Sequence, residues 1–161
     1  MKKSYRAHLA IAVLVTAGSV NAAPHCFPAF GTYKQVRIEG NSCNSPLEQC
    51  SIVNFKGTMN GTALNAVTRV AGTPDFPISG VLGGTSDGEF EGRVRNRRGG
   101  MTFKYAALID SIGRGDAVAL LTLIEGSGEL TGATGTLRFS TVFDLDAAET
   151  STTYEGQICL P

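Results

Sequence analysis

The sequence predicts an all-β protein, a single closed antiparallel β-barrel of about eight strands. Two observations favour this fold class. Short alternating or continuously apolar runs recur along the chain between glycine-rich turns, and no helical periodicity of useful length appears after the first two dozen residues. The remaining 138 or so residues suffice for one domain with its own core. Closing the sheet into a barrel removes its exposed edges.

The N-terminal segment has the pattern of a secretory signal peptide. A positively charged start, MKKSYR, precedes the apolar stretch AHLAIAVLVTAGSV and the small residues of VNAAP. We expect cleavage after Ala22 or Ala23, so residues 1–23 form the leader and residues 24–161 the barrel domain. No other apolar run approaches the roughly 20 residues that a spanning helix needs. The sequence therefore predicts an exported protein, periplasmic or extracellular, without a membrane span.

The charge that remains after cleavage bears on the partners. Lys2, Lys3 and Arg6 belong to the leader, so 11 basic and 14 acidic residues remain, a net charge of −3. This mildly acidic balance argues against nucleic acid as a partner.

The four cysteines all follow the predicted leader, and an even number in an exported chain indicates disulfide bonds. Three pairings are possible. We favour Cys43–Cys50, which closes the short loop CNSPLEQC, together with Cys26–Cys159, which joins the two ends of the domain. A zinc site needs ligand pairs at short spacing, which these cysteines do not form. We expect no metal site and no cofactor.

Nine segments have strand-like patterns. They lie near residues 32–40, 51–59, 62–71, 78–85, 89–96, 101–109, 117–125, 134–143 and 151–159. Asn60-Gly61, Asp87-Gly88 and Gly99-Gly100 are predicted turns, because such pairs readily adopt positive φ.

The segment 117–125, AVALLTLIE, is apolar on both faces. Val118, Leu120 and Ile124 share one face, whereas Leu121 and Leu123 share the other. A barrel strand that faces water should alternate between apolar and polar residues. We therefore expect another segment or another subunit to cover its outer face, and a homo-oligomer would do so.

The glycine-rich stretch GSGELTGATGTLRF, residues 126–139, does not fit a phosphate-binding loop. Gly126 and Gly128 follow a strand, but Gly132 comes one residue too late for a dinucleotide fingerprint, and a strand rather than a helix follows it. The glycines therefore indicate a connection between two strands.

The same stretch resembles the G-x-G-x-[FLY]-x-G-A-T-G block of the allene oxide cyclase barrel-like family. SCNSPLEQC followed by FKGTMNGT, and the C-terminal YEGQICLP, resemble parts of a secreted bacterial branch, so the likeness covers most of residues 41–159. The resemblance implies an eight-stranded antiparallel barrel, often oligomeric. Its cavity, in relatives such as plant allene oxide cyclases and dirigent proteins, holds an apolar or polycyclic molecule. None of their functional residues matches a position here, so no catalytic role is carried over.

Two polar features of the sequence, a single histidine and a run of arginines, do not indicate a functional site. His25 is the one histidine after the leader, which disfavours Ser-His-Asp, Cys-His and histidine-rich metal sites. The run RVRNRRGG, residues 93–100, would place Arg93, Arg95 and Arg97 on one face with Glu89 and Glu91 if it formed a strand. We interpret it as a solvated surface of mixed charge.

Six aromatic residues are predicted to point into the barrel. They are Tyr33, Phe55, Phe90, Phe103, Tyr105 and Phe143. They either fill the core or, if the lumen is not full, line a ligand pocket in which Tyr105 is the polar group.

Three functions fit these features, and whether the protein is an enzyme stays open. The favoured hypothesis is a non-catalytic exported barrel that binds an apolar small molecule or a partner. The alternatives are a cyclase or isomerase that shapes a hydrophobic substrate in the cavity, and a structural or adhesive surface protein. A cavity inside the barrel would favour the first two.

Overall fold

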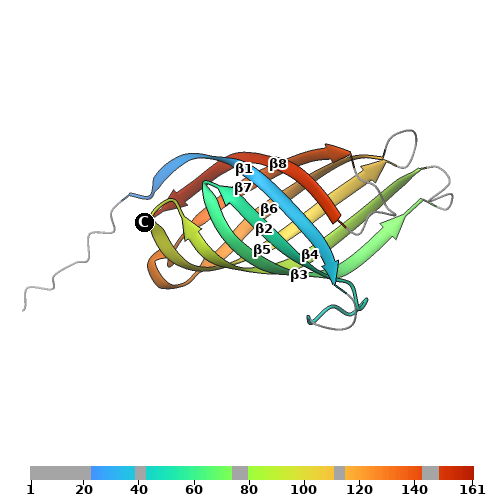
Figure 1. Cartoon of the computed structure of the whole chain (residues 1–161), viewed down its shortest axis with the longest axis horizontal. Helices are drawn as coiled ribbons and strands as arrows, with labels where there is room; N and C mark the ends of the chain where they lie inside the picture. Colours follow the sequence, from blue (N-terminus) through green and yellow to red (C-terminus); the bar gives the residue numbers. More distant parts are fainter. Residues whose placement is uncertain (1–22, 39–42, 74–79, 111–114, 143–148) are drawn as a thin grey trace, which may run out of the picture.

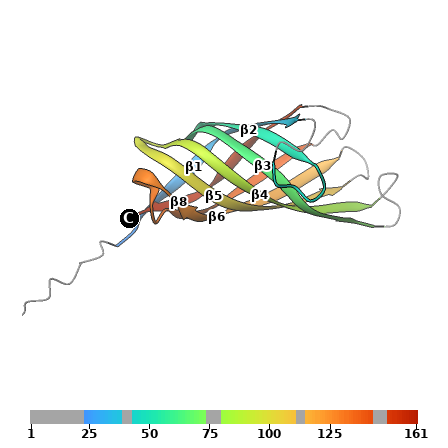
Figure 2. The same ribbon diagram turned by 90° about the horizontal axis from the view of Figure 1, so that it is seen from below.

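The barrel predicted from the sequence is confirmed. The computed structural model describes residues 23–38, 43–73, 80–110, 115–142 and 149–161, and the predicted signal peptide, apart from Ala23, lies outside them. Eight antiparallel strands follow one another around a closed ring, and β8 pairs with β1 (Figures 1 and 2). The strands are β1 (His25–Ile38), β2 (Cys50–Gly57), β3 (Met59–Gly72), β4 (Val81–Val94), β5 (Arg97–Asp110), β6 (Asp116–Gly126), β7 (Thr134–Val142) and β8 (Glu149–Leu160).

Side chains alternate between lumen and solvent along the strands, as the pleat requires. On β6, the buried Leu121 and Leu123 point inward, whereas Val118, Leu120 and Ile124 are 47%, 49% and 54% exposed. The two apolar faces expected for this strand are therefore both present, one in the core and one on the surface.

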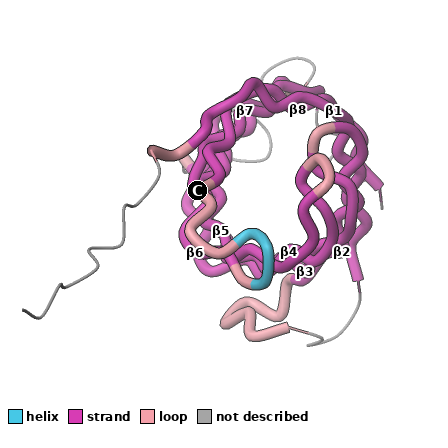
Figure 3. The backbone as a smooth tube through the Cα atoms, turned by 90° about the vertical axis from the view of Figure 1, so that its left-hand side faces the viewer, coloured by secondary structure: helices cyan, strands magenta, loops and turns pink. Residues whose placement is uncertain are grey.

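The connection between β6 and β7 lies on the rim at one end of the barrel and places Leu130 in the core. It contains a short 3-10 turn, η1 (Gly128–Leu130), which lies at the end of the ring of strands (Figure 3). Leu130 and the nearby Ala133 are almost completely buried. The Arg98 amide donates a 2.7 Å hydrogen bond to the Glu129 carboxylate, which fixes the turn to β5. We call this the plugged end of the barrel.

Both favoured disulfides are present. Cys26 is paired with Cys159, and these residues also face each other in the register of β1 and β8. Cys43 is paired with Cys50 and closes a loop at the start of β2. The other two pairings are therefore wrong.

The predicted turn at Asn60-Gly61 is wrong, since both residues lie inside β3. The chain reverses earlier, between Gly57 and Thr58, where Gly57 has a φ of 115°. The Asn-Gly pair had the right composition for a turn, but the residue with positive φ lies three positions before it.

The predicted turns at Asp87-Gly88 and Gly99-Gly100 are also wrong, because both pairs lie inside strands. The segments 78–85 and 89–96 therefore belong to the single strand β4, which reduces nine predicted strands to eight. Gly88 is needed for packing: a Cβ atom at this position would overlap the ring of Phe103 on β5. The real turn is Arg95-Asn96, with a φ of 55° at Arg95.

The predicted common face of Arg93, Arg95 and Arg97 is wrong for the same reason. Arg95 lies in the turn, and its guanidinium carbon is 3.7 Å from the centre of the Phe27 ring, a cation–π contact. Arg97 starts β5 and donates a 3.0 Å hydrogen bond to the Pro161 carbonyl. Arg95 and Arg97 therefore join β1 and the residue after β8 to the β4–β5 turn at the plugged end.

Candidate functional site

The half of the lumen next to the plugged end is filled by side chains. The rings of Phe55, Phe90 and Tyr154 meet edge to face, with the Phe55 centroid 5.7 Å from Phe90 and 5.8 Å from Tyr154. The Tyr154 hydroxyl accepts a 2.9 Å hydrogen bond from the Met59 amide, so its polar atom is satisfied inside this core. This half of the barrel provides stability.

The opposite half contains a cavity of about 200 Å³. Its floor is aromatic: Tyr33 and Tyr105 both pack against Phe139, with ring centroids 4.9 Å and 5.8 Å apart. Residues farther along the strands from this floor, such as Gln35 and Ile109, form the walls. We call this half of the barrel the pocket end.

One wall of the cavity is apolar and made of small side chains. Ala107 on β5 and Ala119 on β6 are opposite each other in the strand register, and Ala117 lies beside them. Alanine leaves space where a larger residue would fill the lumen, so this wall determines the width of the cavity.

The facing wall is polar. Ser51 on β2 and Asn65 on β3 are Cα partners, and both are almost fully buried. Neither the Ser51 Oγ nor the Asn65 Oδ1 has a hydrogen-bond partner in the described part of the chain. Gln35 and Thr152 belong to the same cavity, but the protein itself satisfies them: Gln35 accepts a 2.5 Å bond from Tyr33, and Thr152 donates to the Ser140 carbonyl at 2.7 Å.

The two tyrosines of the floor are neutral at physiological pH. Burial raises the pKa of Tyr105 to about 12, although its hydrogen bond with Tyr33 opposes this effect. Burial raises the pKa of Tyr33 well above 10, and its contacts with Tyr105 raise it further. Both phenols therefore keep their protons, and Tyr33 donates its hydroxyl hydrogen to Gln35.

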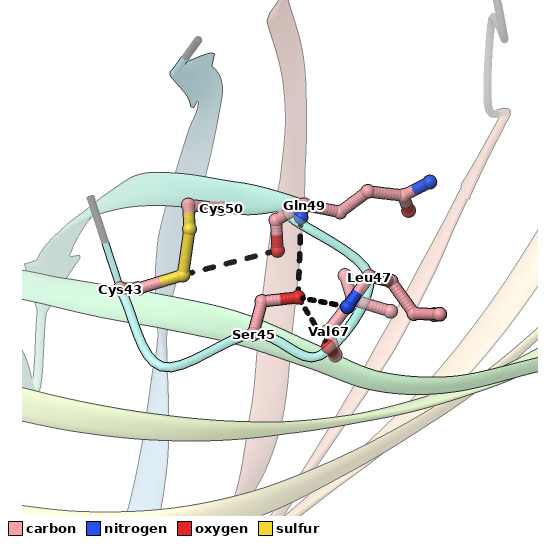
Figure 4. Close-up of a disulfide and its surroundings, with 6 residues drawn as sticks. All are labelled: Cys43, Ser45, Leu47, Gln49, Cys50 and Val67. Carbon is pink, nitrogen blue, oxygen red and sulfur yellow. Dashed lines mark hydrogen bonds between the residues drawn. A yellow bond between two sulfur atoms is a disulfide. The ribbon is translucent and has the colours of Figure 1, made fainter. Parts of the chain in front are cut away.

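The Cys43–Cys50 loop lies at the pocket end and is held in a defined shape (Figure 4). The Ser45 hydroxyl donates a 2.6 Å bond to the Val67 carbonyl and accepts bonds from the amides of Leu47 and Gln49. Gln49 and Cys50 contribute to the cavity lining. The disulfide therefore stabilises part of the site as well as the loop.

Five of the six aromatic residues predicted for the lumen point into it, but only two reach the cavity. Tyr33 and Tyr105 form its floor, whereas Phe55, Phe90 and Phe103 belong to the packed core. The sixth, Phe143, lies outside the described residues. Phe139 and the polar residues Ser51 and Asn65 also line the cavity, although the sequence pattern did not predict them there.

A second hollow, of about 580 Å³, lies on the outer surface over β3 to β7. Leu108, Val118 and Leu120 form its apolar part, and Leu108 is 55% exposed. Arg69 and Arg138 flank it. The covering segment expected for the outer face of β6 is not found among the described residues.

Within the described ranges, no group of three or more histidine, cysteine or acidic residues is arranged to hold a metal ion. In the same ranges, no helix is both long and apolar enough to cross a membrane.

Comparison with known proteins adds no family. No protein-family model matches the sequence, and no curated protein matches it either. The likeness to the allene oxide cyclase barrel-like family therefore stays a resemblance of motifs.

Proposed function

We propose that the protein is an exported barrel that binds a small, flat, largely apolar molecule in the cavity at the pocket end. The observation that carries this proposal is the uneven lumen, packed solid in one half and hollow in the other. A barrel that served only as a scaffold would gain stability by filling both halves. Aromatic rings below and alanines on one side give the cavity flat apolar surfaces, which favour a flat ligand.

The groups around the cavity favour binding over conversion of the ligand. The ionisable residues that line it in the described chain are Tyr33, Tyr105 and Arg37. Both phenols stay protonated at physiological pH, so they are poor bases. The cyclase or isomerase hypothesis has no further observation in its favour.

The proposed location is the periplasm or the cell exterior. The two disulfides are compatible with an oxidising compartment, and the N-terminal sequence has the pattern of a leader.

The proposal can be tested with 2-naphthol as a flat, largely apolar probe, titrated calorimetrically into residues 24–161 with both disulfides formed. Ala119→Leu fills the cavity and should weaken binding at least tenfold, whereas Leu120→Ala, on the outer face of the same strand, should not change it. Far-UV circular dichroism verifies the fold of each variant. Absence of binding to the wild type, or sensitivity to Leu120→Ala alone, would show that the cavity is not the site.

The outer hollow favours a second role, self-association. Exposed Leu108, Val118 and Leu120 form a continuous apolar surface, and a second copy of the chain could bury it. Leu120→Lys should convert an oligomer to a monomer in sedimentation velocity, whereas Leu64→Lys, on the outer face of β3, should not. A wild-type protein that is monomeric at all concentrations would contradict this role.

A further inference from the structure

The polar wall of the cavity holds two hydrogen-bonding atoms that the described chain leaves unused. The Ser51 Oγ and the Asn65 Oδ1 are both buried and both without a partner. A buried polar atom without a partner lowers the stability of a protein, so such atoms in a cavity indicate a missing hydrogen-bonding group.

The two residues that carry these atoms are neighbours on adjacent strands. Ser51 and Asn65 face each other across β2 and β3, and their side chains line the same cavity. Two of their polar neighbours differ in this respect, since Gln35 is paired with Tyr33 and Thr152 with the Ser140 carbonyl. The unused hydrogen-bonding capacity is therefore concentrated at one place, opposite the alanine wall.

We propose that Ser51 and Asn65 form a subsite for a hydroxyl group of the ligand, an inference that rests on the proposed function. A hydroxyl can donate to the Asn65 Oδ1 and accept from the Ser51 hydroxyl, so it satisfies both atoms at once. A hydrocarbon satisfies neither, and a carboxylate has no hydrogen to donate to the Asn65 oxygen. The ligand class is thus a flat apolar molecule with a hydroxyl on one edge, which rests its apolar face against Ala107 and Ala119.

The test compares three probes of the same shape, 2-naphthol, naphthalene and 2-naphthoate, with the disulfide-bonded protein. We expect 2-naphthol to bind about tenfold more tightly than naphthalene, the effect of about one net hydrogen bond, and more tightly than 2-naphthoate. Ser51→Ala and Asn65→Leu should each reduce this preference, and the double variant should abolish it. Thr62→Val, which removes an exposed hydroxyl on the outer face of β3, should retain it.

A second readout separates a binding role from a structural one. Ser51→Ala and Asn65→Leu remove unsatisfied groups, so without a ligand these variants should melt at the wild-type temperature or above it. Residues that only support the fold would give lower melting temperatures.

Three outcomes would overturn the subsite. Equal affinity for 2-naphthol and naphthalene would contradict it and leave the proposed function intact. Tighter binding of 2-naphthoate would show that the cavity recognises an anion instead, with Arg37 as the cation in its lining. Absence of binding by any of the three probes would refute the proposed function and the subsite together.

Discussion

Gly88 shows how one residue determines the packing inside the barrel. The ring of Phe103 on β5 occupies the space where a Cβ atom of residue 88 would lie. Gly84 lies on the same inward face of β4, but a Cβ atom there would be 3.4 Å from its nearest neighbour, the Arg69 carbonyl oxygen. The two glycines therefore differ in their tolerance of a side chain.

Gly88→Ala should lower the free energy of unfolding by about 2 kcal/mol or more, because the Phe103 ring must move out of its place in a packed core. Gly84→Ala, whose new methyl group would face the cavity, should change it by less than about 0.5 kcal/mol. Urea unfolding followed by circular dichroism measures both. Equal losses of unfolding free energy for the two variants would contradict the claim that the Phe103 ring occupies the space beside Gly88.

Tyr105 makes the free energy of unfolding of the barrel depend on pH in the alkaline range. Its pKa is about 12 in the folded protein, whereas an unfolded tyrosine titrates near 10. Between these values the unfolded chain loses its proton first, so the free energy of unfolding should fall as the pH rises above 10, by up to roughly 2 kcal/mol for this residue. Tyr105→Phe should reduce the fall, measured by urea unfolding at pH 9 and pH 11.5. A variant with the same pH dependence as the wild type would exclude Tyr105 as its source.

At the scale of elements, the glycine-rich connection between β6 and β7 packs one leucine into the core. Gly128 and Gly132 have φ values of 64° and 78°, which let the chain turn sharply on the rim of the plugged end. This turn packs the Leu130 side chain, which has no exposed surface, against the core. The expectation of a strand-to-strand connection was correct, but its packing against the core depends on contacts that the sequence does not display.

Leu130→Ala should destabilise the barrel by about 2–5 kcal/mol, the usual loss for a leucine removed from a packed core. Leu120→Ala, which truncates a side chain that is 49% exposed, should cost much less. Thermal melting of both variants tests this difference. A small loss at Leu130 would mean that η1 covers the barrel without supporting it.

The fold could be predicted from local patterns, but its turns could not. Alternation on segments such as 134–143 and 151–159 placed the last two strands within a few residues of their observed bounds. The Asp87-Gly88 pair wrongly predicted a turn, because Gly88 instead leaves space for the Phe103 ring on the next strand. These two residues are 15 positions apart in the sequence. The dipeptide alone does not reveal whether its glycine forms a turn or leaves space for a side chain of another strand.

The site was predictable only in part, because its aromatic residues have a recognisable pattern and its small polar residues do not. Tyr33 and Tyr105 could be placed in the lumen because aromatic residues at alternating positions usually face a core. Ser51 and Asn65 are small and polar, and such residues are usually assigned to the surface. The missed signal was their position, since Ser51 lies two residues before the buried Val53 and Asn65 two after the buried Ala63.

At the scale of the whole molecule, the barrel divides into a stabilising half and a hollow half. The Cys26–Cys159 disulfide joins the strands β1 and β8 toward the plugged end, whereas Cys43–Cys50 holds a loop at the pocket end. The aromatic core lies between η1 and the cavity. This division separates the residues that maintain the fold from those that we propose to hold a ligand.

Methyl NMR of the alanines tests the proposed ligand site most directly, because alanines lie on every relevant surface. With alanine methyl groups labelled with carbon-13, 2-naphthol should shift the signals of Ala107, Ala117 and Ala119, which line the cavity. The signals of Ala63, in the packed core, and of Ala106, on the outer face of β5, should stay in place. Shifts at Ala106 without a shift at Ala117, which lines the inner cavity but not the outer hollow, or no shifts at saturating probe, would contradict a ligand site inside the barrel.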